Sequence, residues 1–319
     1  MSEWSNTRAN PMIDPALRVW HAEVSLYLFL GGLVAGIMVL LALRRLLRPA
    51  AAASPAVVLA AWSAPLLLGL GMLFLWLDLE NRWNAYRFYF IFRPATPMSW
   101  GAWILLLVYP VSLAFAWGET PAAARARWSV PWRVSRAAQR LEPWLQRQHR
   151  RLGMAQLGLG LLLGIYTGIL LGTFVARPLW NSAALGPLFL VSGLSSAAAF
   201  LLLLRLAPDD RRALARLDVS FLMVEIVILA LWFVALATGN VHAQTAVRLF
   251  FGGDYTAAFW TLVVALGLVT PLVAASIEHR HGTVPGRAAA LLVLAGALAL
   301  RWIVVEAGQT TTSVAQLGS

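Results

Sequence analysis

The sequence contains no cysteine. This absence excludes disulfides, cysteine-bound iron–sulfur clusters, c-type haem attachment and thiolate chemistry from this chain. Lysine is absent as well, so all 25 of the Lys and Arg residues counted together are arginines. Charged residues make up only 12% of the 319 residues, about half the share found in soluble domains. Most of the chain must therefore lie in lipid rather than around a water-bounded core.

What the chain has instead is long apolar runs. Hydrophobic residues account for 60% of the sequence, and the mean hydropathy is +0.72. A membrane-spanning helix needs about 20 apolar residues, and the alternation typical of a lipid-exposed β-barrel is missing. We therefore predict an all-α integral membrane protein, one polytopic domain over residues 1–319, with about eight transmembrane helices. The expected spans are about 24–43, 56–78, 100–117, 153–175, 185–206, 218–238, 257–277 and 286–307.

The arginines predict how the spans are oriented. The net charge of +11 is concentrated in loops between the apolar runs, which is typical of membrane topology rather than of nucleic-acid binding. The loops after the first, third, fifth and seventh spans hold 17 arginines, whereas the opposite side holds 7. The positive-inside rule then places those four loops in the cytoplasm and both termini outside, in the periplasm.

Three segments outside the spans have distinct expected roles. The polar tail 1–22 shows no cleavable signal peptide and is expected outside. The basic loop 119–151, with three tryptophans, is expected on the cytoplasmic side against anionic lipid. The loop 79–98 is aromatic and basic although it faces outside, so it is a candidate docking surface for another protein. The alternative is an ordinary aromatic belt. The candidate docking residues are Arg82, Trp83, Tyr86, Arg87 and Arg93.

Few ionisable side chains fall in or beside the spans, and such groups are functional candidates because lipid makes them costly. They are His21, Glu23, Asp78, Glu225, Arg301 and Glu306, joined by the hydroxyl of Tyr166. A quinone has two carbonyl oxygens that accept hydrogen bonds and gain protons on reduction. His21 and Tyr166 could donate those bonds, and Asp78 could exchange the protons. Each also has a structural alternative, in an ion pair, at the interface or in packing.

The remaining ionisable groups point to proton transfer. Glu225 with Arg301 could form part of an inner proton route, or the two could simply form ion pairs or lie neutral. Glu306 and Glu23 are further candidates for proton transfer near the outer surface. No span has an interior histidine, so we expect neither bound haem nor a metal site in this chain.

Several strings resemble the NrfD, or polysulphide reductase membrane-subunit, family. The first-helix signature lies at 26–36, the third-helix start at Pro97-Met-Ser-Trp-Gly-Ala-Trp103, and the closing motif at 301–309. Further matching strings are Tyr166-Thr-Gly168, 176–181, 190–196, 253–260 and 267–271. They cover most of residues 20–309 in the family's order, although the basic loop 119–151 has no counterpart.

The resemblance implies eight helices in two four-helix bundles in the bacterial cytoplasmic membrane. The chain would bind menaquinone or ubiquinone near the outer face and hold no redox cofactor of its own. A ferredoxin-like [4Fe–4S] subunit would dock outside, with a molybdopterin or cytochrome subunit beyond it. A histidine near the first helix and a later tyrosine bind quinone in this family. They match His21 and Tyr166, and Tyr27 and Tyr86 compete for the second role. The other hypotheses are a passive anchor without a quinone site and a secondary transporter, whose inverted repeats are not evident.

Overall fold

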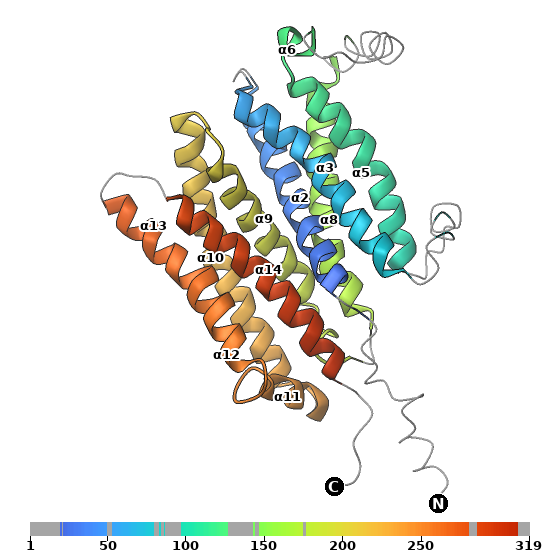
Figure 1. Cartoon of the computed structure of the whole chain (residues 1–319), viewed down its shortest axis with the longest axis vertical. Helices are drawn as coiled ribbons and strands as arrows, with labels where there is room; N and C mark the ends of the chain where they lie inside the picture. The colour runs from blue at the N-terminus through green and yellow to red at the C-terminus, as the bar shows by residue number, and fades with distance from the viewer. Residues whose placement is uncertain are drawn as a thin grey trace, which may run out of the picture.

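The computed structural model describes residues 20, 22–49, 53–79, 83, 86, 97–126, 143, 147–174, 177–280 and 286–311. Within these residues all regular structure is helical, and eight helical segments are long and apolar enough to cross a membrane. The predicted fold class, an all-α protein with eight spans, is confirmed. Both ends of the described chain lie at the same end of the molecule (Figure 1). That arrangement agrees with an even number of spans.

The first four spans form one bundle, the N-terminal bundle. It consists of α2 (Ala22–Leu47), α3 (Pro55–Asp78), α5 (Pro97–Glu119) and α8 (His149–Gly172), with the short α6 (Ala122–Ala126) after α5. These helices pack side by side in the order α3–α5–α8 around α2 (Figure 1). We call the end where α2 begins and α3 ends the cavity end, and the end where α2 ends and α8 begins the far end.

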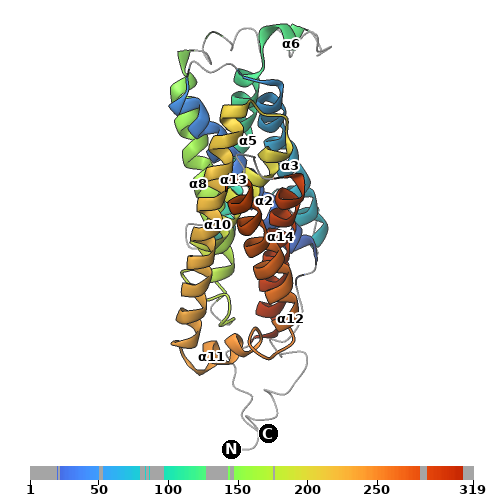
Figure 2. The ribbon, with the colours of Figure 1, turned by 90° about the vertical axis from the view of Figure 1, so that its left-hand side faces the viewer.

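The last four spans form the C-terminal bundle. Its helices are α9 (Leu185–Leu203), α10 (Pro208–Ala237), the composite seventh span and α14 (Arg287–Thr310). The seventh span joins α12 (Thr256–Ala258), η2 (Phe259–Val269) and α13 (Thr270–Arg280), and the short α11 (Val241–Arg248) precedes it. Figure 2 shows α11 and α12 together at one end of the molecule. Helix α2 also contacts α9 and α14, so it is the most buried span and joins the two bundles.

Local sequence sets several helix starts. Ser54 caps α3 by accepting a hydrogen bond from the Val57 N–H, and Pro55 follows at the first helical position. Helix α10 also begins with proline, Pro208. Two aspartates then lie in its first turn, where a helix favours negative charge.

Glycines allow the two bundles to approach closely. A Cβ at Gly193 of α9 would overlap the backbone of Gly32 on α2, and one at Gly36 would overlap Gly193. Gly267 and Gly296 meet in the same way between η2 and α14. In lipid, where apolar surfaces gain little by leaving the solvent, such close packing is a main source of helix association.

Two spans differ from their predicted form. Helix α10 begins at Pro208, ten residues before the predicted 218, because the charged turns there extend the helix beyond its apolar part. Glu225 therefore lies near the middle of α10. The seventh span contains an 11-residue π-helix, η2, which hydropathy alone does not reveal.

Candidate functional site

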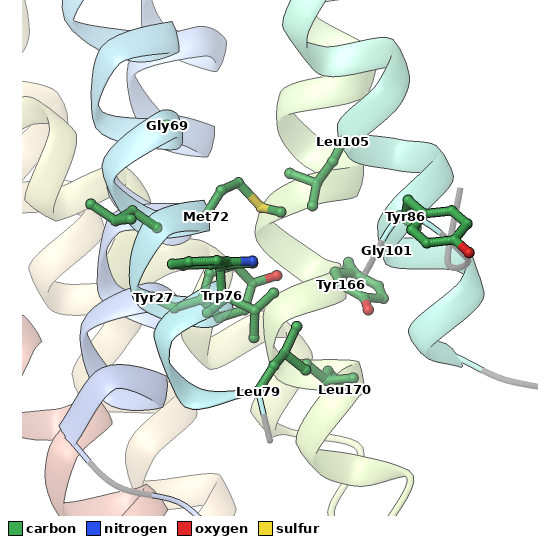
Figure 3. A pocket seen from close by; sticks show the side chains of 13 residues that line it. Tyr27, Gly69, Met72, Trp76, Leu79, Tyr86, Gly101, Leu105, Tyr166 and Leu170 are labelled. Atoms are coloured by element: carbon green, nitrogen blue, oxygen red, sulfur yellow. The ribbon is translucent and has the colours of Figure 1, made fainter. Parts of the chain in front are cut away.

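A cavity of about 480 Å³ opens among the four helices of the N-terminal bundle, toward the cavity end. Its walls come from α2, α3, α5 and α8, with two residues, Leu79 and Tyr86, from the segment after α3 (Figure 3). This volume lies within the range of small-molecule sites. The lining is mostly apolar or aromatic: Tyr27, Gly69, Met72, Leu73, Leu75, Trp76, Leu79, Tyr86, Gly101, Ala102, Leu105, Tyr166 and Leu170.

Tyr166 brings the main polar group into the cavity. Its side chain is buried on α8, and its hydroxyl lies against Gly101 on α5. Any Cβ at position 101 would overlap that hydroxyl, so the absence of a side chain there lets the tyrosine lie where it does. Because Tyr166 lines the cavity, its hydroxyl can donate a hydrogen bond to a ligand there.

Aromatic rings enclose the rest of the site. Trp76 and Met72 reach from α3 toward Tyr166, with Tyr27 beside them (Figure 3). Trp83 lies edge-on to Trp76, with ring centroids 6.5 Å apart. Flat, apolar walls with a few hydroxyl groups suit a planar, apolar ligand that carries hydrogen-bond acceptors.

The tyrosines proposed as competing candidates share this site. Tyr27, Tyr86 and Tyr166 all line the cavity, so the sequence alternatives are neighbours rather than rivals. Tyr86 was expected to serve partner docking, and the structure places it at both the cavity and the surface, with 55% of the residue exposed. Trp76 and Met72 were missed. Their spacing with Gly69 and Leu79, three or four residues apart, marks one helical face and was the available signal.

The other predicted quinone ligands fare differently. His21 lies outside the described residues. Asp78 is the last residue of α3 and is half-buried, next to Leu79, but its side chain is not part of the cavity lining. The role predicted for Asp78, proton exchange with the quinone, therefore stays a prediction.

The chain next to His21 is held firmly. A single side-chain amide, that of Gln309 on α14, accepts from the Trp20 N–H at 2.8 Å and donates to the Trp20 carbonyl at 2.9 Å. The Trp20 ring stacks on Trp180, whose own N–H donates to the Val304 carbonyl. The C-terminal bundle thus fixes the chain just before α2 begins.

A second polar group of residues lies in the C-terminal bundle. Arg301 is fully buried, donates to the Ser192 hydroxyl at 3.1 Å and to the Phe189 carbonyl at 3.1 Å, and interacts electrostatically with Glu225. Ser192 also interacts with Glu225. Glu225 and Arg301 thus belong to one buried group, and their role in proton transfer stays a prediction. Asp218, two turns earlier on α10, joins the group through a 3.3 Å bond from Ser195, and this residue was missed.

Three further predicted residues that the structure describes, Glu23, Glu306 and Trp83, do not line the cavity. Glu23, in the first turn of α2, and Glu306, near the end of α14, are half-buried. Trp83 is 85% exposed, and its role in docking stays a prediction. Arg82, Arg87 and Arg93 lie outside the described residues.

Comparison with known proteins agrees with this architecture. Residues 9–314 match the sequence profile of the family described as "Polysulphide reductase, NrfD". The chain is 31% identical to "Protein NrfD" of Escherichia coli (strain K12), over 92% of this chain and 96% of that protein. It is 29% identical to the polysulfide reductase C chain of Wolinella succinogenes, over 92% of this sequence and 95% of that one.

Proposed function

Because the chain belongs to the polysulphide reductase NrfD family, we propose that it is the quinone- or quinol-reacting membrane subunit of a respiratory oxidoreductase complex. The observation that carries this proposal is the cavity among α2, α3, α5 and α8, with the Tyr166 hydroxyl inside it. A passive anchor would need packed helices there, since empty space within a bundle forfeits dispersion contacts. A quinone, as a planar apolar ring with two carbonyl acceptors, matches the walls and the donor.

The residues of the site would bind and orient the ring. Tyr166 donates a hydrogen bond to one carbonyl, and the missing side chain at Gly101 leaves room for its hydroxyl. His21, beside the anchored Trp20, is the proposed second donor. Trp76 and Met72 pack on the ring face and exclude water. Asp78, at the cavity end of α3, is the proposed acid that exchanges protons with the quinone.

Electrons must come from or go to another protein, because this one lacks cysteine ligands. We place a ferredoxin-like [4Fe–4S] subunit on the exposed Trp83 and Tyr86 and on the arginines of the loop 79–98, with a molybdopterin or cytochrome subunit beyond it. The name of the Wolinella relative makes that protein one subunit of a polysulfide reductase. The proposed location is the bacterial cytoplasmic membrane. The proposed quinone is menaquinone or ubiquinone.

The buried group in the C-terminal bundle is assigned to proton transfer. Arg301 supplies a fixed positive charge, and Glu225 the exchangeable proton, linked through Ser192. Glu306 and Glu23 are the proposed proton carriers nearer the outer face. Costly buried charges of this kind, facing the interior of a bundle, are typical of proton relays in membrane proteins.

The test is Tyr166→Phe in the whole complex, purified with its partner subunits and assayed with a soluble quinol analogue. The change removes one hydroxyl, so the quinol KM should rise roughly 5- to 100-fold, as expected for a lost buried hydrogen bond of about 1–3 kcal/mol. Electron transfer within the soluble subunits, measured with dyes, should stay normal. Wild-type quinol kinetics in Tyr166→Phe would leave the passive anchor as the better account.

A further inference from the structure

A buried carboxyl lies at the far end of the N-terminal bundle, where the proposed quinone site does not use it. Glu119 is the last residue of α5 and is 5% exposed. Its Oε1 lies 3.4 Å from the Arg45 Nε on α2, a long ion pair. Its Oε2 is buried and has no hydrogen-bond partner within the described part of the chain. A buried carboxylate oxygen of this kind calls for a donor.

Asp210 shows what a purely structural carboxylate looks like at the same end. Its Oδ2 accepts from the Arg44 Nε at 3.0 Å, and its Oδ1 accepts from the Arg48 Nη1 at 2.9 Å. Both of its oxygens are therefore paired with arginines of α2. Glu119 faces the same helix with only half of its carboxyl satisfied, so an ion pair alone does not explain it.

A second unsatisfied oxygen lies deeper in the same bundle. Gln156 on α8 is 1% exposed, and its Oε1 has no partner among the described residues. Its depth follows from its neighbours, since Gly153 faces Leu46 and Gly160 faces Val39. Gln156 therefore lies about level with residues 42–43 of α2, just inside Arg45. Two buried acceptors at successive depths are what a short file of water molecules would satisfy.

Polar groups continue from there toward the cavity. Ser112 is buried two helical turns before Glu119, on the same side of α5. The Tyr109 hydroxyl lies 3.4 Å from where a Cβ of Gly69 would be, and Gly69 lines the cavity. Leu105, two turns beyond Ser112 on that side of α5, lines the cavity as well. One helix thus runs from the buried carboxyl to the inner end of the cavity.

We propose that Glu119 is the site of proton exchange with the far face, and that Gln156, Ser112 and Tyr109 conduct protons through water between it and the quinone cavity. The inference rests on the proposed function. Reduction of one quinone takes two electrons from the docked partner and two protons through Glu119, and oxidation returns both. The arginine distribution assigns the far end to the cytoplasm. Electrons would then reach the quinone from one side of the membrane and protons from the other.

The experiment uses the whole complex in liposomes, with a quinone analogue, a reduced dye as electron donor to the partner, and a pH indicator trapped inside or added outside. Wild type should take up one proton per electron from the far-face side. Glu119→Gln, which keeps shape but cannot carry a proton, should slow quinone turnover on the order of 100-fold at unchanged quinone KM. Glu119→Asp should restore much of the rate. The matched control, Asp210→Asn, should turn over normally.

The outcomes separate this inference from the function beneath it. Wild-type turnover in Glu119→Gln, or proton uptake from the cavity-end side, would overturn the route while leaving the quinone site intact. If wild-type complex does not react with quinones at all, the proposed function fails first. Should Glu119→Gln not assemble, Gln156→Leu decides, since it removes the deeper acceptor: slowed turnover supports the route, and an unchanged rate refutes it.

Discussion

The contact between Gly101 and Tyr166 gives the sharpest prediction about the cavity. Gly101→Ala adds one methyl group on α5, directly where the Tyr166 hydroxyl lies. The tyrosine must then rotate or shift, because the overlap involves its ring as well as its oxygen. The variant therefore displaces the proposed hydrogen-bond donor without touching Tyr166 itself.

The size of the effect follows from two opposing terms. Alanine is favoured over glycine in a helix by about 1 kcal/mol, whereas overpacking costs about 1–3 kcal/mol. Net destabilisation of about 0–2 kcal/mol should leave the complex assembled. Loss of a hydrogen bond to the quinone of about 1–3 kcal/mol should raise the quinol KM roughly 5- to 100-fold.

The assay is quinol-dependent turnover of the purified complex, with assembly checked by size-exclusion chromatography. Gly158→Ala on α8 is the matched control, because a Cβ there meets nothing within 4 Å. It should keep the wild-type KM. Combined with Tyr166→Phe, Gly101→Ala should add little, since both act on one interaction. A wild-type KM in assembled Gly101→Ala would refute the placement of the hydroxyl in the quinone site.

Two predictions concern the junction between the bundles. Arg301→Met removes a buried cation that interacts with Glu225 and donates to Ser192 and Phe189. It should destabilise the protein by about 3–5 kcal/mol, with partial recovery on adding Glu225→Gln; thermal unfolding in detergent measures this, and an unchanged midpoint in Arg301→Met would contradict a stabilising role of the arginine. Gly193→Ala, which overlaps the Gly32 backbone, should destabilise by about 1–3 kcal/mol. Gly118→Ala, which meets nothing within 4 Å, should not lower the midpoint, and equal effects of both variants would count against the close approach of α2 and α9.

Much of the fold was predictable because lipid imposes simple rules. A span must be apolar and about 20 residues long, so hydropathy found all eight. The same reasoning failed at 208–217, where charged turns prolong α10 beyond the apolar run, and at η2, because hydropathy reports no hydrogen-bond pattern. The site was only partly predictable. Tyr166 emerged from the sequence, whereas Trp76 and Met72 look like ordinary apolar residues of a span.

The sequence by itself determined that this is a membrane protein of about eight helices, because its composition and its long apolar runs leave no alternative. The lack of cysteine also excludes cysteine-bound iron–sulfur clusters from this chain. Only the tertiary structure decided which polar side chains meet. Helix rotation and tilt depend on packing at a few glycine contacts, which periodicity does not encode. The packed helices bring Tyr27, Tyr86 and Tyr166 to one cavity and bury Glu119 at the other end of the same bundle.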